Sequence, residues 1–434
     1  MRVLSLDRVL YFRVAQIPVV LFLAIVLNWC FMTPEAAIGQ ESSIAPETFM
    51  IQETDLVGLR YTKAETILEL LPHPIPGRFT KAELREFERR IPNLSLFDRV
   101  LVTTQGEALR VDVREKITLA PILEFTSGRT FKDTSVTAGI VEYNIGGTGT
   151  QLGAEFSYSQ RGPNAEIWLS QHSYHPTRWA KEVKLSYNAN GFRFEKSSAT
   201  WSRRRLGGEF ELKGPFSYWS SLRYEVVVRT YRELIEDGAR DQPPNGYYIG
   251  IAPEVIWDRY HWHDLVPNGY RIELQLRPGY FLGPGQNRHE VRLRYLQGIP
   301  LAATTVLMIN SVAEAVNAGN PNHSVLIGSI AGVRGLQDNL FRNRAQSYAN
   351  FELRHAVPLA PRWALQGVLF SDVGAFERFN EEGQPLGWKG AANIGAGLRL
   401  VPTFLSNTLV RIDYARLFAP ERTSFVQFGI TQYF

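Results

Sequence analysis

The segment Ala392-Asn393-Ile394-Gly395-Ala396-Gly397-Leu398-Arg399-Leu400 alternates apolar residues with polar residues or glycine. Successive side chains of a β-strand point to opposite faces, so this pattern predicts a strand with one apolar and one polar face. Residues 410–414 and 426–429 repeat the pattern near the end of the chain. A soluble sandwich would bury its apolar face in a core. Because the other face here carries Arg, Asp, Gln and Asn, the pattern favours a lipid-facing wall around a wet lumen.

The same signal recurs from Thr118 to the end of the chain, where we find no convincing helix. We count sixteen segments, an even number, as single-chain bacterial barrels prefer. Their centres lie near Ile122, Ile140, Phe156, Trp168, Leu185, Phe210, Tyr224, Ala252, Leu274, Leu293, Leu307, Phe351, Phe370, Ile394, Ile412 and Phe428. The predicted fold class is therefore mainly β: a 16-stranded transmembrane antiparallel β-barrel over residues 117–434, preceded by one small α+β domain.

The predicted connections alternate in length along the barrel. Those after even-numbered strands are short, for example residues 146–149, 214–215 and 402–406, with 258–269 as a longer exception. Several after odd-numbered strands are long, namely residues 189–203, 233–245, 317–346 and 375–390. Outer-membrane barrels place short turns at the periplasm and longer loops outside, so the sorting supports an outer-membrane barrel.

The first segment predicts export. Arg2, Arg8 and Arg13 precede an apolar run over residues 14–32, and small residues follow near position 39. This pattern predicts a signal peptide over residues 1–39, cut before about Gln40, with an uncleaved anchor helix as the alternative. A linker over residues 40–48 would follow. Cys30 is the only cysteine, so cleavage would leave a mature chain without disulfides or thiolate metal sites.

Residues 49–116 differ from the rest of the chain. Residues 49–57 predict a strand, and two Thr-Lys-Ala-Glu segments, at 62–65 and 80–83, each predict a helix that begins with a capping box. Two further strands follow, at residues 97–104 and 109–115, across a Gln-Gly turn. The predicted order is strand, helix, helix, strand, strand.

This region resembles a polypeptide-transport-associated (POTRA) domain. The likeness is carried by Leu56-Val57-Gly58, the helix at residues 83–90, residues 111–115 and above all Asn93-Leu94-Ser95-Leu96-Phe97-Asp98-Arg99-Val100. The resemblance implies a periplasmic domain that binds client chains or partner proteins, partly by pairing a strand edge with an extended peptide. A spacer that orders the barrel mouth and binds nothing is the alternative.

The long connection at residues 317–346 contains Val333-Arg334-Gly335-Leu336. A connection of this length in a compact architecture is usually functional or mobile. Downstream, Glu352 shares the inward parity of one predicted strand, and Phe370, Asp372 and Gly374 share that of the next. We expect the loop to fold into the lumen, where the planar guanidinium of Arg334 can engage both Glu352 and Asp372.

Here the chain resembles the BamA/TamA family of outer-membrane assembly and translocation proteins, also called bacterial surface antigens. The matching residues are Val333-Arg334-Gly335-Leu336, the Phe370-x-Asp372-x-Gly374 run, Arg411-Ile412-Asp413-Tyr414 and a closing strand with Gly429 and the terminal Phe434. The run from Asp258 to Gly269 also resembles the family and accounts for the longer connection there. The likeness covers residues 51–434.

Three departures from the family pattern stand out. The chain shows one POTRA-like domain where the assembly factors have several, which puts a general, essential assembly role in doubt. Leu336 stands where an aromatic residue is usual, and Gln432 stands at a common apolar or aromatic position. These two substitutions leave the predicted fold intact.

The resemblance implies a protein that works without ATP and assists insertion or translocation of client polypeptides across or into an outer membrane. Its expected partners are client polypeptides, outer-membrane lipid and periplasmic or lipoprotein partners. A passive small-molecule pore and a structural surface anchor are the alternatives. We find no nucleophile elbow and no phosphate loop, and we expect no enzyme and no cofactor. We also expect no metal, because the family-like turn explains His261-Trp262-His263-Asp264 better than a metal site does. The formal net charge of +4 argues against a nucleic-acid partner.

Overall fold

The computed structural model describes residues 47–127, 134–159, 162–171, 179–192, 201–214, 222–236, 246–262, 265–283, 285–317, 325–327, 332–336, 341–379, 384–420 and 422–430. The predicted signal peptide and Phe434 lie outside these residues. No helix in the described part of the chain is both long enough and apolar enough to cross a bilayer.

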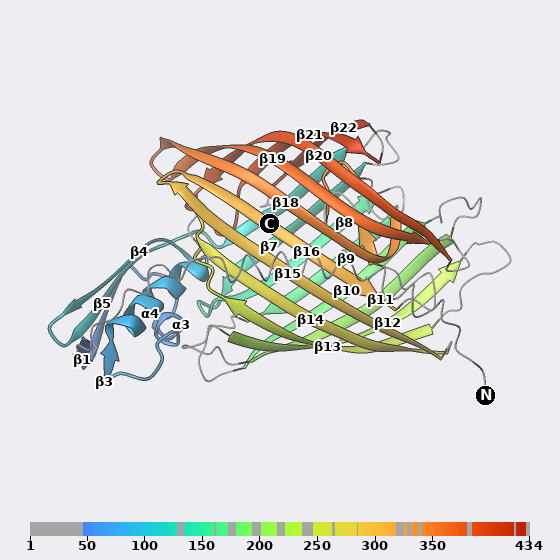
Figure 1. Cartoon of the computed structure of the whole chain (residues 1–434). Helices are drawn as coiled ribbons and strands as arrows, with labels where there is room; N and C mark the ends of the chain where they lie inside the picture. The colour runs from blue at the N-terminus through green and yellow to red at the C-terminus, as the bar shows by residue number, and fades with distance from the viewer. Residues whose placement is uncertain are drawn as a thin grey trace. The chain divides into compact units, whose positions relative to one another are not determined.

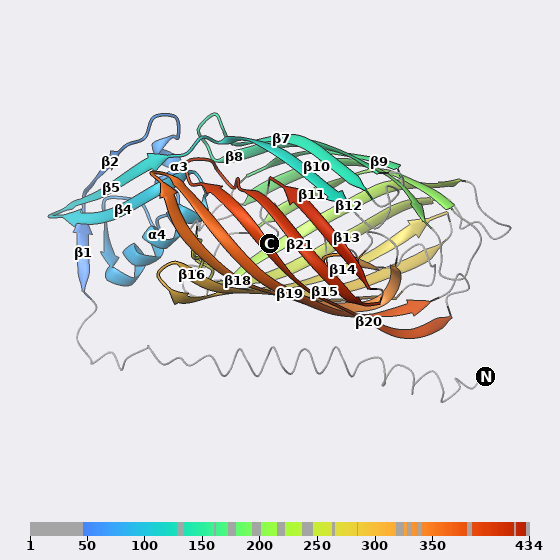
Figure 2. The same ribbon diagram turned by 90° about the horizontal axis from the view of Figure 1, so that it is seen from above.

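In the described residues, sixteen antiparallel strands close into a barrel (Figures 1 and 2). They are β6 (Leu119–Ser127), β7 (Ser135–Ile145), β8 (Thr150–Ser159), β9 (Gly162–Ser170), β10 (Ala180–Phe192), β11 (Trp201–Lys213), β12 (Leu222–Glu236), β13 (Gly246–Asp258), β14 (Gly269–Leu282), β15 (Gln286–Ala302), β16 (Thr305–Val316), β18 (Phe341–Ala360), β19 (Trp363–Phe379), β20 (Pro385–Pro402), β21 (Val410–Ala419) and β22 (Thr423–Gly429). A short strand, β17 (Val325–Ile327), pairs with β18. Each predicted strand centre falls inside one barrel strand, so the predicted fold class is confirmed.

All four predicted long connections are shorter than expected, because the flanking strands extend into them. β10 ends at Phe192 and β11 begins at Trp201, inside the connection expected at 189–203, and β12 ends at Glu236, inside that expected at 233–245. β19 and β20 pair as far as Phe379 and Pro385, so the connection expected at residues 375–390 shortens to residues 380–384. β18 begins at Phe341, inside the connection expected at 317–346. These strand ends alternate poorly in polarity, but the ladder is made by backbone groups and continues whatever the side chains are.

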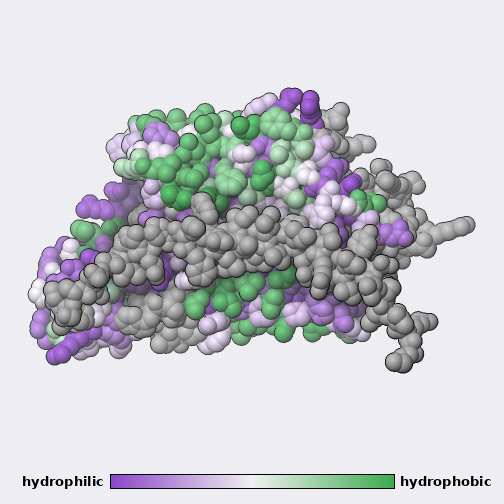
Figure 3. Space-filling model, in the orientation of Figure 1, coloured by the Kyte–Doolittle hydropathy of each residue, from purple (hydrophilic) through white to green (hydrophobic). Residues whose placement is uncertain are grey.

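The two faces of the wall differ as the alternation predicts. Outward side chains such as Leu369, Ile394 and Ile412 are exposed and apolar. Figure 3 shows hydrophobic residues gathered over the outside of the barrel strands on the face in view. Inward neighbours such as Arg399 and Asp413 are buried and charged. This arrangement satisfies every backbone group of a lipid-embedded wall by closure and keeps the charges in the lumen.

The residues before the barrel form a small α+β domain with two sheets. β1 (Thr48–Ile51) pairs with β3 (Gly77–Thr80), and the order in the second sheet is β2 (Glu53–Val57), β5 (Ala108–Glu115), β4 (Phe97–Gln105). Helices α3 (Ala64–Leu68) and α4 (Lys81–Asn93) complete the domain, with a core that includes Ile67, Phe79, Phe87 and Val111. The single strand predicted at residues 49–57 is wrong, because the chain breaks at Gln52 to serve both sheets.

The two predicted capping boxes differ in outcome. Thr80 caps α4: its hydroxyl accepts from the Glu83 N–H, and the Glu83 side chain accepts from the Thr80 N–H, so this prediction is confirmed. Thr62 does not cap α3, whose N-cap is Lys63 without a side-chain bond. The Thr62 hydroxyl instead accepts from the Asn144 amide at 2.9 Å, because this part of the chain contacts the β7–β8 turn.

The α+β domain contacts several turns at one end of the barrel. Arg89 and Asn93 of α4 donate to the Tyr260 carbonyl at 2.8 and 3.1 Å. Arg362, between β18 and β19, pairs with Asp98 of β4 at 2.8 Å. The amide of Lys63 donates to the Gly147 carbonyl at 2.8 Å. The domain is therefore tied to turns that follow three different strands.

Glu115 makes the stability of this domain pH-dependent. Its carboxylate accepts from the backbone N–H of Tyr61 at 3.0 Å and of Thr62 at 2.8 Å. Burial acts to raise its pKa, but hydrogen bonds from the Thr62, Arg60 and Tyr61 backbone outweigh burial and hold it below 4.5. A depressed carboxyl pKa contributes stability that is present above 4.5 and lost as the pH falls through the folded pKa. We expect Glu115→Gln to lower the urea concentration at which half of the α+β domain is unfolded at pH 7. This midpoint should also fall less between pH 7 and about pH 3.5 than it does in the wild type.

The matched control for Glu115→Gln is Glu53→Gln, at an exposed carboxylate of the same sheet. It should leave both the midpoint at pH 7 and its acid decline unchanged. An equal decline in wild type and Glu115→Gln would remove Glu115 as the cause.

Candidate functional site

The segment Gly332 to Leu336 lies inside the barrel between β17 and β18. Val333 and Leu336 pack in a buried apolar cluster with Phe376 and Leu417, which come from β19 and β21. Gly335 has a φ of 91°, a conformation that favours glycine. A Cβ on Gly374 would lie 3.0 Å from Val333 Cγ2, so Gly374 makes room for the loop. The loop is thus held by packing on both sides of its arginine.

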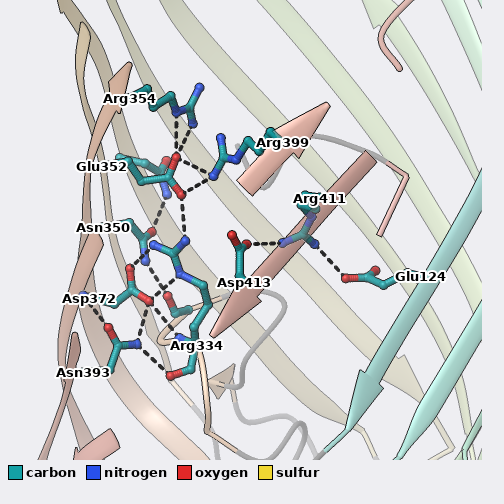
Figure 4. A network of polar contacts seen from close by, with 12 residues as sticks. Glu124, Arg334, Asn350, Glu352, Arg354, Asp372, Asn393, Arg399, Arg411 and Asp413 are labelled. Carbon is teal, nitrogen blue, oxygen red and sulfur yellow. Dashed lines mark hydrogen bonds and ion pairs between the residues drawn. The ribbon is translucent and has the colours of Figure 1, made fainter. Parts of the chain in front are cut away.

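Arg334 is fully buried between two carboxylates (Figure 4). Its Nε and Nη2 donate to Asp372 at 2.8 and 2.6 Å, and its Nη1 donates to Glu352 at 2.7 Å. Its backbone N–H adds a bond to Asp372 at 3.0 Å. The guanidinium also lies 3.5 Å from the centroid of the Phe370 ring, a cation–π contact. One planar group therefore joins the loop to β18 and β19.

Glu352 receives two further arginines. Arg354 of β18 approaches it at 2.6 Å, and Arg399 of β20 at 2.8 Å. All three arginines and the carboxylate are buried. Buried guanidinium groups are stable only when a counter-charge lies beside them. Glu352 is therefore the anion on which Arg334, Arg354 and Arg399 together depend.

Two asparagines complete the network. Asn393 of β20 donates to Asp372 Oδ2 and to the Arg334 carbonyl, each at 2.7 Å. Asn350 of β18 donates to the Gly332 carbonyl at 2.7 Å. The loop backbone is therefore bound as well as its side chain.

A second polar cluster lies where the barrel closes. Arg411 of β21 donates to Asp413 at 3.1 Å and to Glu124 of β6 at 2.9 Å (Figure 4). Gln427 of β22 also donates to Glu124. Among the residues labelled in Figure 4, the arginines Arg334, Arg354, Arg399 and Arg411 are matched by the carboxylates Glu124, Glu352, Asp372 and Asp413.

The backbone ladder at this closure is short. Within the described residues, β22 and β6 are in register over four residue pairs, Val426 to Gly429 against Ser127 to Glu124. β19 and β20 are in register over seventeen pairs. Among the wall pairings of the described residues, β22–β6 therefore has the fewest residue pairs in register, and the Ile430 N–H adds one backbone bond to the Leu123 carbonyl at 2.6 Å.

The structure brings together most of the residues that the sequence singled out. Val333, Arg334, Gly335, Leu336, Glu352, Phe370, Asp372 and Gly374 lie in one network, whereas Gly429 lies at the seam beside Arg411 and Glu124. Phe434 lies outside the described residues. Their functional roles remain predictions.

Sequence reasoning did not assign contacts to Arg354, Asn393, Arg399, Glu124 or Gln427. The available signal was a charged or amide residue at an inward position of a predicted strand. That signal places a side chain in the lumen but does not say which neighbour it meets.

The barrel and its lumenal loop define a class: a sixteen-stranded barrel with an arginine-bearing loop bound to its inner wall. Three solved structures are examples with a similar overall fold. They are BamA from Haemophilus ducreyi lacking POTRA domains 1–3 (12% identity, TM-score 0.51, 88% of this chain and 85% of that one), CdiB from Acinetobacter baumannii (12%, 0.59, 88% and 73%) and CdiB from Escherichia coli (9%, 0.54, 92% and 93%).

The chain thus has a barrel of the BamA and CdiB type, and at the level of the fold the resemblance inferred from the motifs is confirmed. No protein-family model and no curated protein matches the chain.

Proposed function

We propose that this chain is an outer-membrane protein that assists insertion or translocation of client polypeptides, with its α+β domain, a POTRA-like domain, in the periplasm. The observation that carries the proposal is the barrel fold that the chain shares with BamA and CdiB, closed where the first and last strands of the wall, β6 and β22, meet. A client strand can enter a barrel wall only where two strands part and expose unpaired backbone groups. We expect β22 and β6 to be the strands that part, because within the described residues they share the fewest residue pairs of the wall.

Client capture begins, in this proposal, on β4. Within the described part of the α+β domain, β4 has β5 as its one neighbour in the sheet, so its other edge is open to an extended peptide. Leu101 projects from β4 and is 45% exposed, which gives such a peptide an apolar contact. Asp98, at the start of the same strand, is paired with Arg362 at the barrel, so capture on β4 occurs close to the mouth.

The lumenal network holds the remaining wall rigid while the seam opens. Arg334 links the loop to β18 and β19, and Glu352 extends the link to β20 through Arg399. Opening is then confined to strands outside this link. β22 and β6 lie outside it.

Reconstitution tests the proposal directly. In liposomes, the wild-type chain should accelerate folding of an urea-unfolded eight-stranded barrel about tenfold or more over empty liposomes. A Phe125→Cys/Phe428→Cys pair, at residues in register across the seam, should form a disulfide that blocks the acceleration, and a reductant should restore it. Cys30→Ser serves as the background. Acceleration that persists with the seam locked would overturn seam entry.

The same vesicles separate the other functions. Steady solute flux without a client would favour the passive pore, and neither flux nor acceleration would favour a surface anchor. For capture, a photo-crosslinker at Thr103 on β4 should label the client, whereas one at Asp55 on β2, the other edge of the sheet, should not. Equal labelling at both positions would remove β4 as the specific capture strand.

A further inference from the structure

The seam carries a side-chain connection in addition to its backbone ladder. We propose that Glu124 and Arg411 form a charged latch on the lumenal side of the seam, and that Gly429 keeps the path of this latch open. The inference rests on the proposed function, in which the seam opens. It adds a specific connection that must break for opening to occur.

The latch joins strands that are not neighbours. Arg411 is in register with Gly429, and Gly429 is in register with Glu124, so the three residues form one row across β21, β22 and β6. Arg411 Nη2 nevertheless donates to Glu124 Oε1 at 2.9 Å. Because adjacent strands lie about 4.8 Å apart, the two side chains together bridge about 10 Å of wall.

Gly429 is the residue over which the guanidinium passes. A Cβ at this position would lie 3.1 Å from Arg411 Nε and 3.5 Å from its Nη2. The Gly429 backbone does not have a positive φ, so glycine is not required for its conformation. What a side chain at position 429 would disturb is the path of Arg411.

Two further contacts suit a latch that can release. Gln427 also donates to Glu124, so this carboxylate holds both β21 and β22. Asp413 binds the same guanidinium from within β21, at 3.1 Å. When β6 moves away, Arg411 therefore keeps its bond to Asp413, because both residues lie on β21. The buried cation is not left without a counter-charge in either state.

With four residue pairs in register across the described part of the seam, the loss of one charged connection should be measurable. A hydrogen bond to a charged group is worth enough to change an opening equilibrium about tenfold. Glu124→Gln removes the charge of the latch and leaves Arg411 with Asp413. Gly429→Val keeps every charge but places a branched side chain in the path of Arg411.

The test is amide hydrogen exchange by mass spectrometry on the full-length chain in lipid nanodiscs, without a client. Glu124→Gln and Gly429→Val should each raise exchange in peptides covering β6 and β22 about tenfold, and leave β13 and β14 unchanged. The double variant Glu124→Gln/Gly429→Val should raise seam exchange to within about threefold of either single variant, because both changes act on the same connection. The control is Glu166→Gln, which breaks a Glu166–Lys184 pair of 3.0 Å between β9 and β10 and should leave the seam unaffected.

Unchanged seam exchange in Glu124→Gln and Gly429→Val would overturn the latch. So would an equal rise in all strands, or a double variant whose rise is the product of the two single rises. The readout is independent of client transfer. A latch that responds in a chain that never inserts a client would refute the proposed function alone, whereas client insertion with an unresponsive seam would refute the latch alone.

Discussion

Glu352→Gln is expected to destabilise the barrel more than a change at any other residue of the lumenal network. Glutamine keeps the shape of the side chain but removes the charge that Arg334, Arg354 and Arg399 share. Arg334 retains Asp372, but Arg354 and Arg399 both lose their contact with this carboxylate, at a position with no exposed surface. Breaking a buried pair by removing one partner costs about 3–5 kcal/mol, and here two arginines are affected.

Urea titration of the reconstituted barrel, followed by the mobility shift between folded and heat-unfolded protein on gels, measures this cost. The control is Glu209→Gln, which removes a carboxylate paired with Arg229 at 3.1 Å where the two side chains are 36% and 23% exposed. A half-exposed pair of this kind is worth up to about 1 kcal/mol. Similar midpoints for the two variants would show that Glu352 is not the anion on which the network depends.

The barrel could be predicted because side chains along each strand of its wall point alternately to the lipid and to the polar lumen. Residues such as Ile394 and Asn393 therefore carry the strand signal in themselves, and the predicted centres fall inside the strands. The same physics does not mark where a strand ends beyond the apolar band. Lys389 pairs with Phe376 in a ladder that continues into a predicted loop, because backbone bonds do not depend on side-chain polarity.

The centre of the site could be predicted from parity. Arg334 stands in a long loop, and Glu352 and Asp372 stand at inward positions of adjacent strands, so one guanidinium between two carboxylates follows. Arg399 could not be placed in the same way. Its partner Glu352 lies on a strand that is not its neighbour, and their contact depends on how far the strands are staggered around the barrel.

At Thr62 a prediction from local sequence was wrong, because a contact with a residue far away in the chain replaced the helix cap. Thr62-Lys63-Ala64-Glu65 has the composition of a capping box, yet the Thr62 hydroxyl accepts from Asn144, which is 82 residues away. Among the described contacts, no distant residue binds the Thr80 hydroxyl, and there the helix cap forms. Local capping chemistry was therefore predictive only where tertiary contacts left the hydroxyl available.

Arg334→Lys is expected to release the lumenal loop while it preserves the charge. Lysine presents one ammonium group and cannot reproduce the forked geometry that reaches Asp372 through Nε and Nη2 and Glu352 through Nη1. At least one carboxylate loses its bond to the loop, at about 1.5–3 kcal/mol for each charged hydrogen bond lost. Contact with the Phe370 ring weakens too, because the planar group 3.5 Å from its centroid is gone.

Limited proteolysis within the loop, together with client folding in liposomes, measures this release. We expect faster cleavage at Arg334→Lys and a drop of about tenfold in client acceleration, since the network would no longer confine opening to the seam. Asp372 still accepts from Asn393 and from the backbone N–H at position 334, so the barrel itself should remain folded. Arg232→Lys is the matched control, because that arginine lies on β12 against the Tyr247 ring, away from the loop. Wild-type cleavage and wild-type acceleration in Arg334→Lys would show that charge alone suffices and that the fork of the guanidinium has no part in holding the loop.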